Sequence, residues 1–158
     1  KMKKIMKTVL FYSLFCFKVL WVTNAIADIM IMDAYARSSG KTATSGAVYM
    51  MIHNHSGQDD RLLRVQSNAA KKVELHTHEE DKNGTVKMLH VPEGFAIEAN
   101  GMLLLTRGKE HIMFMGLKNS WSHGDVLDIE LIFREAGEVK LEVEVDLERK
   151  GGDNDHTH

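Results

Sequence analysis

Cysteine is almost absent from this chain of 158 residues, in which Cys16 is the only one. Cys16 falls within the first 27 residues, and the preceding letters of "SLFC" lack the small side chains expected before a lipid-modified cysteine. Without that segment the chain has no thiol. This excludes disulfide bonds, thiol redox chemistry, cysteine nucleophiles and metal sites that use cysteine sulfur. The remaining chemistry belongs to histidine, methionine and carboxylate side chains.

The chain also lacks an apolar run long enough to span a bilayer. Residues 1–27, "KMKKIMKTVLFYSLFCFKVLWVTNAIA", have a basic start, an apolar middle and a finish of small residues, which is the layout of a secretory signal peptide. A transmembrane anchor is the alternative, but Lys18 leaves the apolar run short of the roughly 20 residues that a spanning helix needs. We therefore predict cleavage after Ala27 and export to the periplasm.

An excess of positive charge is missing as well. Five of the 20 basic residues and none of the 22 acidic residues lie in residues 1–27, so the other 131 residues carry 15 basic and 22 acidic groups, a formal charge of −7. Such a surface disfavours nucleic acid and anionic membranes as partners, and we expect no stable membrane insertion after cleavage. It is compatible with a cationic cargo. A chain of this length is sufficient for one domain with a single core.

No window has a sustained helical period, whereas short alternating segments are frequent. The clearest is "EVKLEVEVDL" (138–147), in which apolar and charged residues alternate. Further strands are expected in "IMIMDAYA", "AVYMMIHN", "RLLRVQS", "KKVELHTH", "TVKMLHV", "FAIEA", "MLLLT", "HIMFMGL" and "VLDIELIF", separated by turns rich in glycine, asparagine and aspartate. We predict a single all-β domain at 28–148, an antiparallel Greek-key sandwich or barrel, followed by a flexible tail at 149–158.

Histidine and methionine share strand faces at two places in the chain. In "HIMFMGLK", His111 and Met113 point the same way, with alpha carbons roughly 6.5 to 7 Å apart. In the predicted hairpin "VELHTH"–"TVKMLHV", His76 faces away from the core and Met88 lies on the neighbouring strand. Thioethers are soft donors that favour Cu(I), and imidazole binds copper in either oxidation state. The alternative is that the methionines fill gaps in the core and the histidines are solvated.

The roles of other residues near these strands allow more than one interpretation. We expect Met115 to pack deeper than its neighbours on the same face. His78 and His90 are either solvated or additional donors, and Trp121 either shields the site or packs over the core.

The stretches "VELHTHEEDKNGTVKM", "EHIMFMGLK" and "GDVLDIELIFREAGEVKLEVEV" resemble the PCuAC family of periplasmic copper chaperones. This resemblance implies a cupredoxin-like β-barrel. It also implies a Cu(I) site made of a histidine, a methionine twelve residues later and a downstream His-x-Met, which correspond to His76, Met88, His111 and Met113. Thr77, "LTRGKEH" and "KNSWSHGD" depart from the family pattern in loops and peripheral positions.

The resemblance further implies a non-enzymatic carrier that delivers Cu(I) to a protein such as cytochrome oxidase subunit II or a Sco-type assembly factor. His156 and His158 in the tail resemble the tails of family members that take a second copper, which the resemblance implies to be Cu(II). Two alternatives remain open at this point: a zinc- or copper-dependent periplasmic enzyme, and a β-sandwich that binds protein partners without metal.

Overall fold

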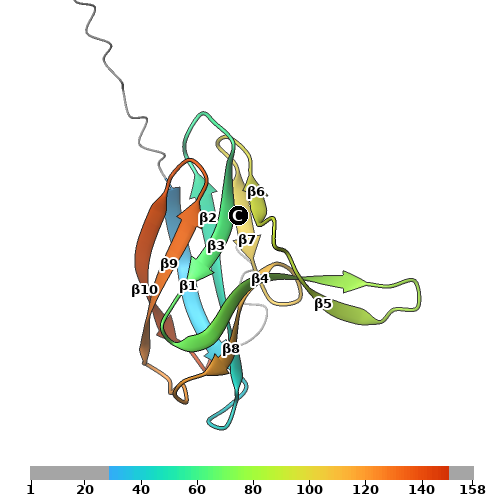
Figure 1. Ribbon diagram of the computed structural model, residues 1–158, viewed down its shortest axis with the longest axis vertical. Coiled ribbons are helices and arrows are strands. Elements are labelled where there is room, and N and C mark those ends of the chain that lie inside the picture. Colours follow the sequence, from blue (N-terminus) through green and yellow to red (C-terminus); the bar gives the residue numbers. More distant parts are fainter. Residues whose placement is uncertain (1–28, 150–158) are drawn as a thin grey trace, which may run out of the picture.

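The computed structural model describes residues 29–149, which form ten β-strands and no helix (Figure 1). The strands are β1 (Ile29–Ser38), β2 (Ser45–Asn54), β3 (Asp60–Gln66), β4 (Ala70–Glu80), β5 (Val86–His90), β6 (Phe95–Ile97), β7 (Met102–Leu105), β8 (His111–Leu117), β9 (Val126–Phe133) and β10 (Glu138–Val145). Accordingly, this part of the chain has no helix that would cross a membrane. The predicted leader and the tail histidines His156 and His158 lie outside the described residues, so the predicted domain boundaries stay predictions.

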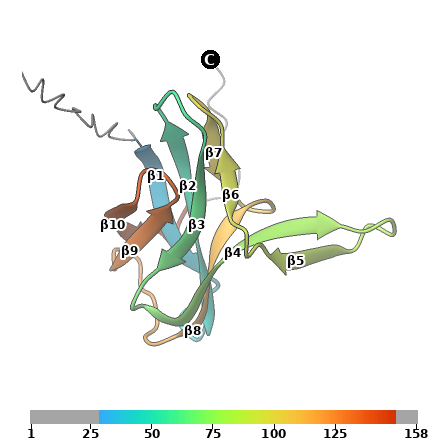
Figure 2. The same cartoon turned by 45° about the horizontal axis from the view of Figure 1, so that its top comes forward.

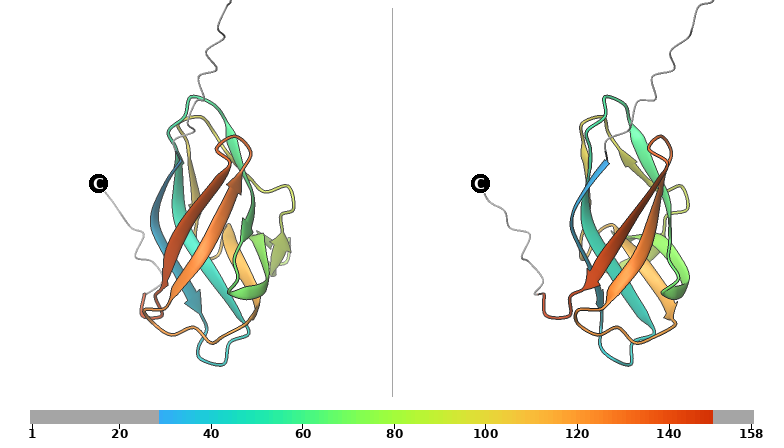
Figure 3. Two further views of the ribbon diagram at one scale, coloured as in Figure 1. Left: turned by 60° about the vertical axis from the view of Figure 1, so that its left-hand side comes forward. Right: turned by 90° about the vertical axis from the view of Figure 1, so that its left-hand side faces the viewer.

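All ten strands belong to one sheet that wraps around a single interior (Figures 2 and 3). The order along the sheet is β5-β4-β8-β2-β1-β10-β9-β3-β6, and β7 pairs with β2. The sheet curls so that β3 contacts β4 and β6 contacts β7. The predicted all-β fold is confirmed. The pairing is antiparallel throughout except between β1 and β10, which run parallel with Tyr35 opposite Glu144.

Strand β2 shows why these sequences form strands around a core. Its residues alternate between the two faces without interruption, and Val48, Met50 and Ile52 are almost fully buried. Successive side chains of a strand point to opposite faces, so Tyr49 and His53 lie on the outer face of the sheet. The inward residues of the other strands complete one core, whose large fully buried members include Phe114, Leu131, Leu62, Ile112 and Val143.

The hairpin formed by β4 and β5 projects from the barrel (Figures 1 and 2). Every residue of β5 is exposed, so the hairpin is held mainly by its backbone ladder rather than by apolar burial. Its turn is stabilised by the carboxylate of Asp81, which accepts hydrogen bonds from the backbone amides of Asn83 and Thr85 at 2.8 and 3.1 Å. Gly84 adopts a φ of 77°, which suits glycine because it has no Cβ.

Trp121 packs over the core, which settles the choice left open by the sequence. Its side chain is 3 % exposed, and its ring centroid lies 5.4 Å from that of Phe114 in an edge-to-face arrangement. The ring covers Gly46 so closely that a Cβ added there would stand 2.2 Å from Trp121 Cζ3. Glycine at position 46 is therefore required by the packing of the indole.

We predict that Gly46→Ala lowers the free energy of unfolding by about 1 to 3 kcal/mol, because the added methyl group overpacks the core beside a buried indole. Urea denaturation measures the change. Gly57→Ala is the matched control: a Cβ at Gly57 meets nothing within 4 Å, and we expect a change within about 0.5 kcal/mol. Equal stabilities of the two variants would contradict this packing.

Candidate metal centre

His76 and His111 face each other across the ladder between β4 and β8. The next pair along this ladder, Leu75 and Ile112, points into the core. Because side chains alternate along a strand, the two histidines point to the outer face. They are nevertheless only 8 % and 2 % exposed, and their ring centroids are 6.0 Å apart. The outer face is thus covered at this point, at the base of the projecting hairpin.

The two predicted methionines lie on the same face as the two histidines. Met113 is opposite Glu74 in the ladder between β4 and β8, and Met88 is opposite His78 in the ladder between β4 and β5. The structure therefore brings the four predicted ligands onto one surface of three adjacent strands. Met88 is 46 % exposed, whereas Met113 is half-buried.

The strand register also brings two other histidines into this cluster. The residue opposite His76 on β5 is His90, with ring centroids 5.9 Å apart. The ring of His78 lies 5.0 Å from that of His111, which is closer than His76 comes. His78 and His90 are therefore neighbours of the predicted ligands; His78 is half-buried and His90 is exposed to solvent.

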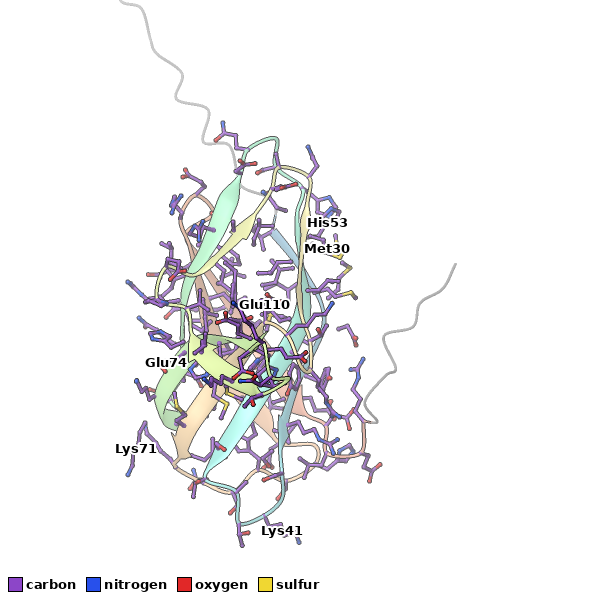
Figure 4. All side chains as sticks on the ribbon, turned by 90° about the vertical axis from the view of Figure 1, so that its right-hand side faces the viewer. Met30, Lys41, His53, Lys71, Glu74 and Glu110 are labelled. Carbon is purple, nitrogen blue, oxygen red and sulfur yellow. The ribbon has the colours of Figure 1, made fainter. Side chains whose placement is uncertain are left out.

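Glu74 is a member of this cluster that the sequence reasoning did not select (Figure 4). Its carboxylate accepts a hydrogen bond from Nε2 of His76 at 3.0 Å and pairs with Nζ of Lys72 at 2.6 Å. Nδ1 of His90 lies 3.7 Å away. The hydrogen bond with His76, and then that with Lys72, lower the pKa of Glu74. The sequence "VELHTH" predicts this position, because Glu74 and His76 are two residues apart on one strand and share a face. A carboxylate there fixes the orientation of an imidazole ligand.

The hydrogen bonds determine which ring nitrogens have a free lone pair. When Nδ1 of His111 donates to the carbonyl oxygen of Lys109 at 2.8 Å, Nε2 is left as the acceptor. When Nε2 of His76 donates to Glu74, Nδ1 of His76 is left as the acceptor. Within residues 29–149, Nδ1 of His76 and Nδ1 of His78 are buried and have no hydrogen-bond partner. Buried polar atoms without partners are uncommon, and lone pairs of this kind are what a metal ion requires.

The donors available here are a mixture of nitrogen and sulfur. Within residues 29–149, no three histidine, aspartate or glutamate side chains lie close enough together to hold a metal ion without other donors. The thioethers of Met88 and Met113 are the further donors that the strand register places on this face. The donor set therefore fits a soft ion better than a hard one.

Burial also sets the protonation state of His111. Removal from water lowers the pKa of this imidazole, the hydrogen bond to Lys109 acts in the opposite direction, and the neighbouring His78 and His76 lower it further. Desolvation disfavours the charged form, so the neutral form of the ring is favoured. A neutral imidazole is the form that binds a metal.

Met115 does not pack as expected. It lies on the same outer face, opposite Lys72, and is half-buried, while the core positions of β8 are occupied by Ile112 and Phe114. The period of two that places Met113 outside the core also places Met115 there.

Comparison with known proteins identifies the family. Residues 29–145 match the family described as "Putative lipoprotein LpqE-like". The chain belongs to this family. A relative from Leifsonia xyli, named "Putative lipoprotein Lxx21020", is 28 % identical over 117 residues, which cover 74 % of this chain and 69 % of the relative.

Solved structures agree with this assignment. The copper-bound PCuAC domain from PmoF2 superimposes with a TM-score of 0.63 at 20 % identity, covering 78 % of this chain and 96 % of that domain. The Cu(I) form of DR1885 from Deinococcus radiodurans gives a TM-score of 0.61 at 25 % identity, covering 81 % of this chain and 85 % of that one. The resemblance to PCuAC domains predicted from the sequence, and their cupredoxin-like fold, are confirmed.

We predict that the stability of the metal-free protein falls as the pH drops below about 6.5, the usual value for histidine. The folded-state pKa of His111 is lowered, so the unfolded chain takes up the proton first and is favoured as the pH falls. Urea denaturation at pH 7 and pH 5.5 measures the loss, which we expect to be smaller in His111→Gln. A loss of the same size in both proteins would contradict a depressed pKa at this position.

Proposed function

We propose that this protein is a non-enzymatic copper carrier that binds Cu(I) through His76, Met88, His111 and Met113. The observation that carries the proposal is the opposed pair His76 and His111. Nδ1 of His76 has no hydrogen-bond partner among the described residues, and Nε2 of His111 is left as an acceptor when its Nδ1 donates to Lys109. The strand register sets Met88 and Met113 on the same face. The ring of His78 lies 5.0 Å from that of His111 and lines the same face.

The chemistry of the donors supports Cu(I) rather than a hard cation. Thioethers are neutral and soft, so they bind Mg²⁺, Ca²⁺ and Mn²⁺ poorly and Cu(I) well. A hydrolytic zinc site uses three histidine or carboxylate ligands and an open position for water, and two thioethers are poorly suited to that role. An ion held by neutral ligands keeps its positive charge, which the carboxylate of Glu74 partly balances.

Two solved relatives that contain copper support the same proposal. One is a copper-bound PCuAC domain from PmoF2 and another is the Cu(I) form of DR1885. Membership in the LpqE-like family, whose description names lipoproteins, supports an exported protein. Cys16 and the predicted signal peptide lie outside the described residues, so lipid attachment and signal cleavage stay untested.

Exposure of one ligand suits a carrier. Met88 is 46 % exposed on a hairpin that projects from the barrel, so a donor from a second protein can reach the ion and displace this thioether first. We propose delivery to an assembling cytochrome oxidase copper centre, either on subunit II or through a Sco-type factor. A second copper, Cu(II), at His156 and His158 is part of the same proposal.

We predict that Met113→Leu and His111→Gln each weaken Cu(I) binding by more than the roughly 10- to 100-fold seen when an outer-shell partner of a ligand is lost. Competition with a Cu(I) chelator under reducing, oxygen-free conditions measures the affinity. Met115→Leu is the matched control, because it is two residues further on the same strand face, and we expect its affinity to be unchanged.

Two results would contradict the proposal. X-ray absorption of the Cu(I) form should show sulfur among the nearest neighbours, and a first shell without sulfur would exclude the thioethers. Zinc binding tighter than Cu(I) binding would favour a metal-dependent enzyme instead.

A further inference from the structure

A second group of soft donors lies on the outer face of β1, β2 and β7. The ladder between β1 and β2 sets Met30 opposite His53, and the ladder between β2 and β7 sets His53 opposite Met102. These three residues, here called the Met30 row, therefore form one straight line across three adjacent strands. Side chains directly opposite each other in antiparallel strands point to the same face, with their Cβ atoms about 4.5 to 5.5 Å apart.

The Met30 row faces solvent rather than the core. The next row along the strands, Ile31, Ile52 and Leu103, points inward and packs against the core. Met30 and Met102 are 46 % and 50 % exposed, so neither serves as core filler. Figure 4 shows Met30 and His53 next to each other on this face. Two flexible thioethers with three rotatable bonds each thus stand on either side of one imidazole.

The strand end beneath this row is rigidly built. The buried side chain of Asn54 donates from Nδ2 to the carbonyl oxygens of Gln58 and Glu98 at 2.8 and 3.1 Å. Its Oδ1 accepts from the backbone amide and the hydroxyl of Ser56 at 3.0 and 2.7 Å. The backbone amide of Asn54 also donates to Gly101. These bonds fix the loops on both sides of His53, so the imidazole and Met102 are held in register.

The imidazole of His53 has a nitrogen available for a ligand. Nε2 lies 3.4 Å from the carbonyl oxygen of Asn100, and when it donates there Nδ1 keeps its lone pair. The ring of His55 lies beside that of His53, with centroids 3.8 Å apart, and adds a second imidazole at the edge of the row. The row therefore offers two sulfur donors and one nitrogen, with a second nitrogen adjacent.

We propose that Met30, His53 and Met102 form a second Cu(I) site, distinct from the centre on β4, β5 and β8. Two thioethers and an imidazole are a three-coordinate set that favours a soft monovalent cation over the hard divalent ions. His53 is four residues along β2 from Tyr49, which is roughly 13 Å at the rise of a strand, and Tyr49 is the residue of β2 whose ring neighbours His111. One ion cannot reach both sets of donors, so each site binds its own.

The test counts Cu(I) ions in the full chain carrying His156→Ala and His158→Ala, which removes the donors of the tail. Metal-free protein is titrated with Cu(I) against a chromophoric chelator under reducing conditions. We expect two Cu(I) in this parent and one after the further changes Met30→Leu and Met102→Leu, which preserve side-chain volume. Met32→Leu is the matched control on the neighbouring row of the same face, and we expect it to retain two.

A second measurement separates this site from the first. In a His76→Gln/His111→Gln variant of the same parent, one Cu(I) should remain, and the methyl resonances of Met30 and Met102 should shift as it binds. Unshifted methyl resonances at saturation, or two ions retained after Met30→Leu and Met102→Leu, would overturn the second site. If only the His76→Gln/His111→Gln change removes an ion, the proposed function stands and the Met30 row is wrong. If only Met30→Leu and Met102→Leu remove one, the second site stands alone.

Discussion

The strict alternation of side chains along β2 is the constraint on which the rest of this structure depends. Its inner face supplies Val48, Met50 and Ile52 to the core, and its outer face remains available for polar and soft side chains. One edge of β2 pairs with β1, whereas the other edge pairs first with β8 and then with β7. A single central strand thus borders both donor clusters: Ala47 is opposite Met113 at one end and His53 is opposite Met102 at the other. A shift of one residue in its register would bury the histidine and expose the core.

The ten strands were predictable from the sequence because the barrel exposes one face of most strands, which leaves a period of two in the letters. The four ligands of the proposed centre were selected by the same period, by the predicted hairpin, and by the resemblance to the PCuAC family, in which a methionine lies twelve residues after the first histidine. The sequence did not reveal which residues of neighbouring strands lie opposite each other. The hairpin register sets Met88 opposite His78, not His76, and moves His90 into the cluster. Glu74 was not among the predicted ligands because a carboxylate is not a soft donor. The same alternation nevertheless places its side chain on the face of His76.

The Met30 row was beyond sequence reasoning for a related reason. Met30, His53 and Met102 are far apart along the chain, and each sits in a separate strand with no motif around it. Only the ladders of β2 with β1 and β7 align them. The burial of His111 could not be anticipated either, since an outward-facing histidine on a sheet is usually solvated. Here the rings of Tyr49, His76 and His78 lie against His111, and its burial lowers the pKa of the imidazole.

The parallel pairing of β1 with β10 also affects how the chain folds. Tyr35 and Glu144 are far apart in the sequence, so β1, the first strand of the described residues, cannot complete its ladder until β10, the last of them, is available. Contacts between residues so distant in sequence make folding slow, because the chain must lose the entropy of closing a long loop before the strands can pair. Until that moment one edge of β1 and one edge of β10 are unpaired, and such edges invite association with other chains. The ladder between β1 and β10 therefore also covers two strand edges that would otherwise be open to association with other chains.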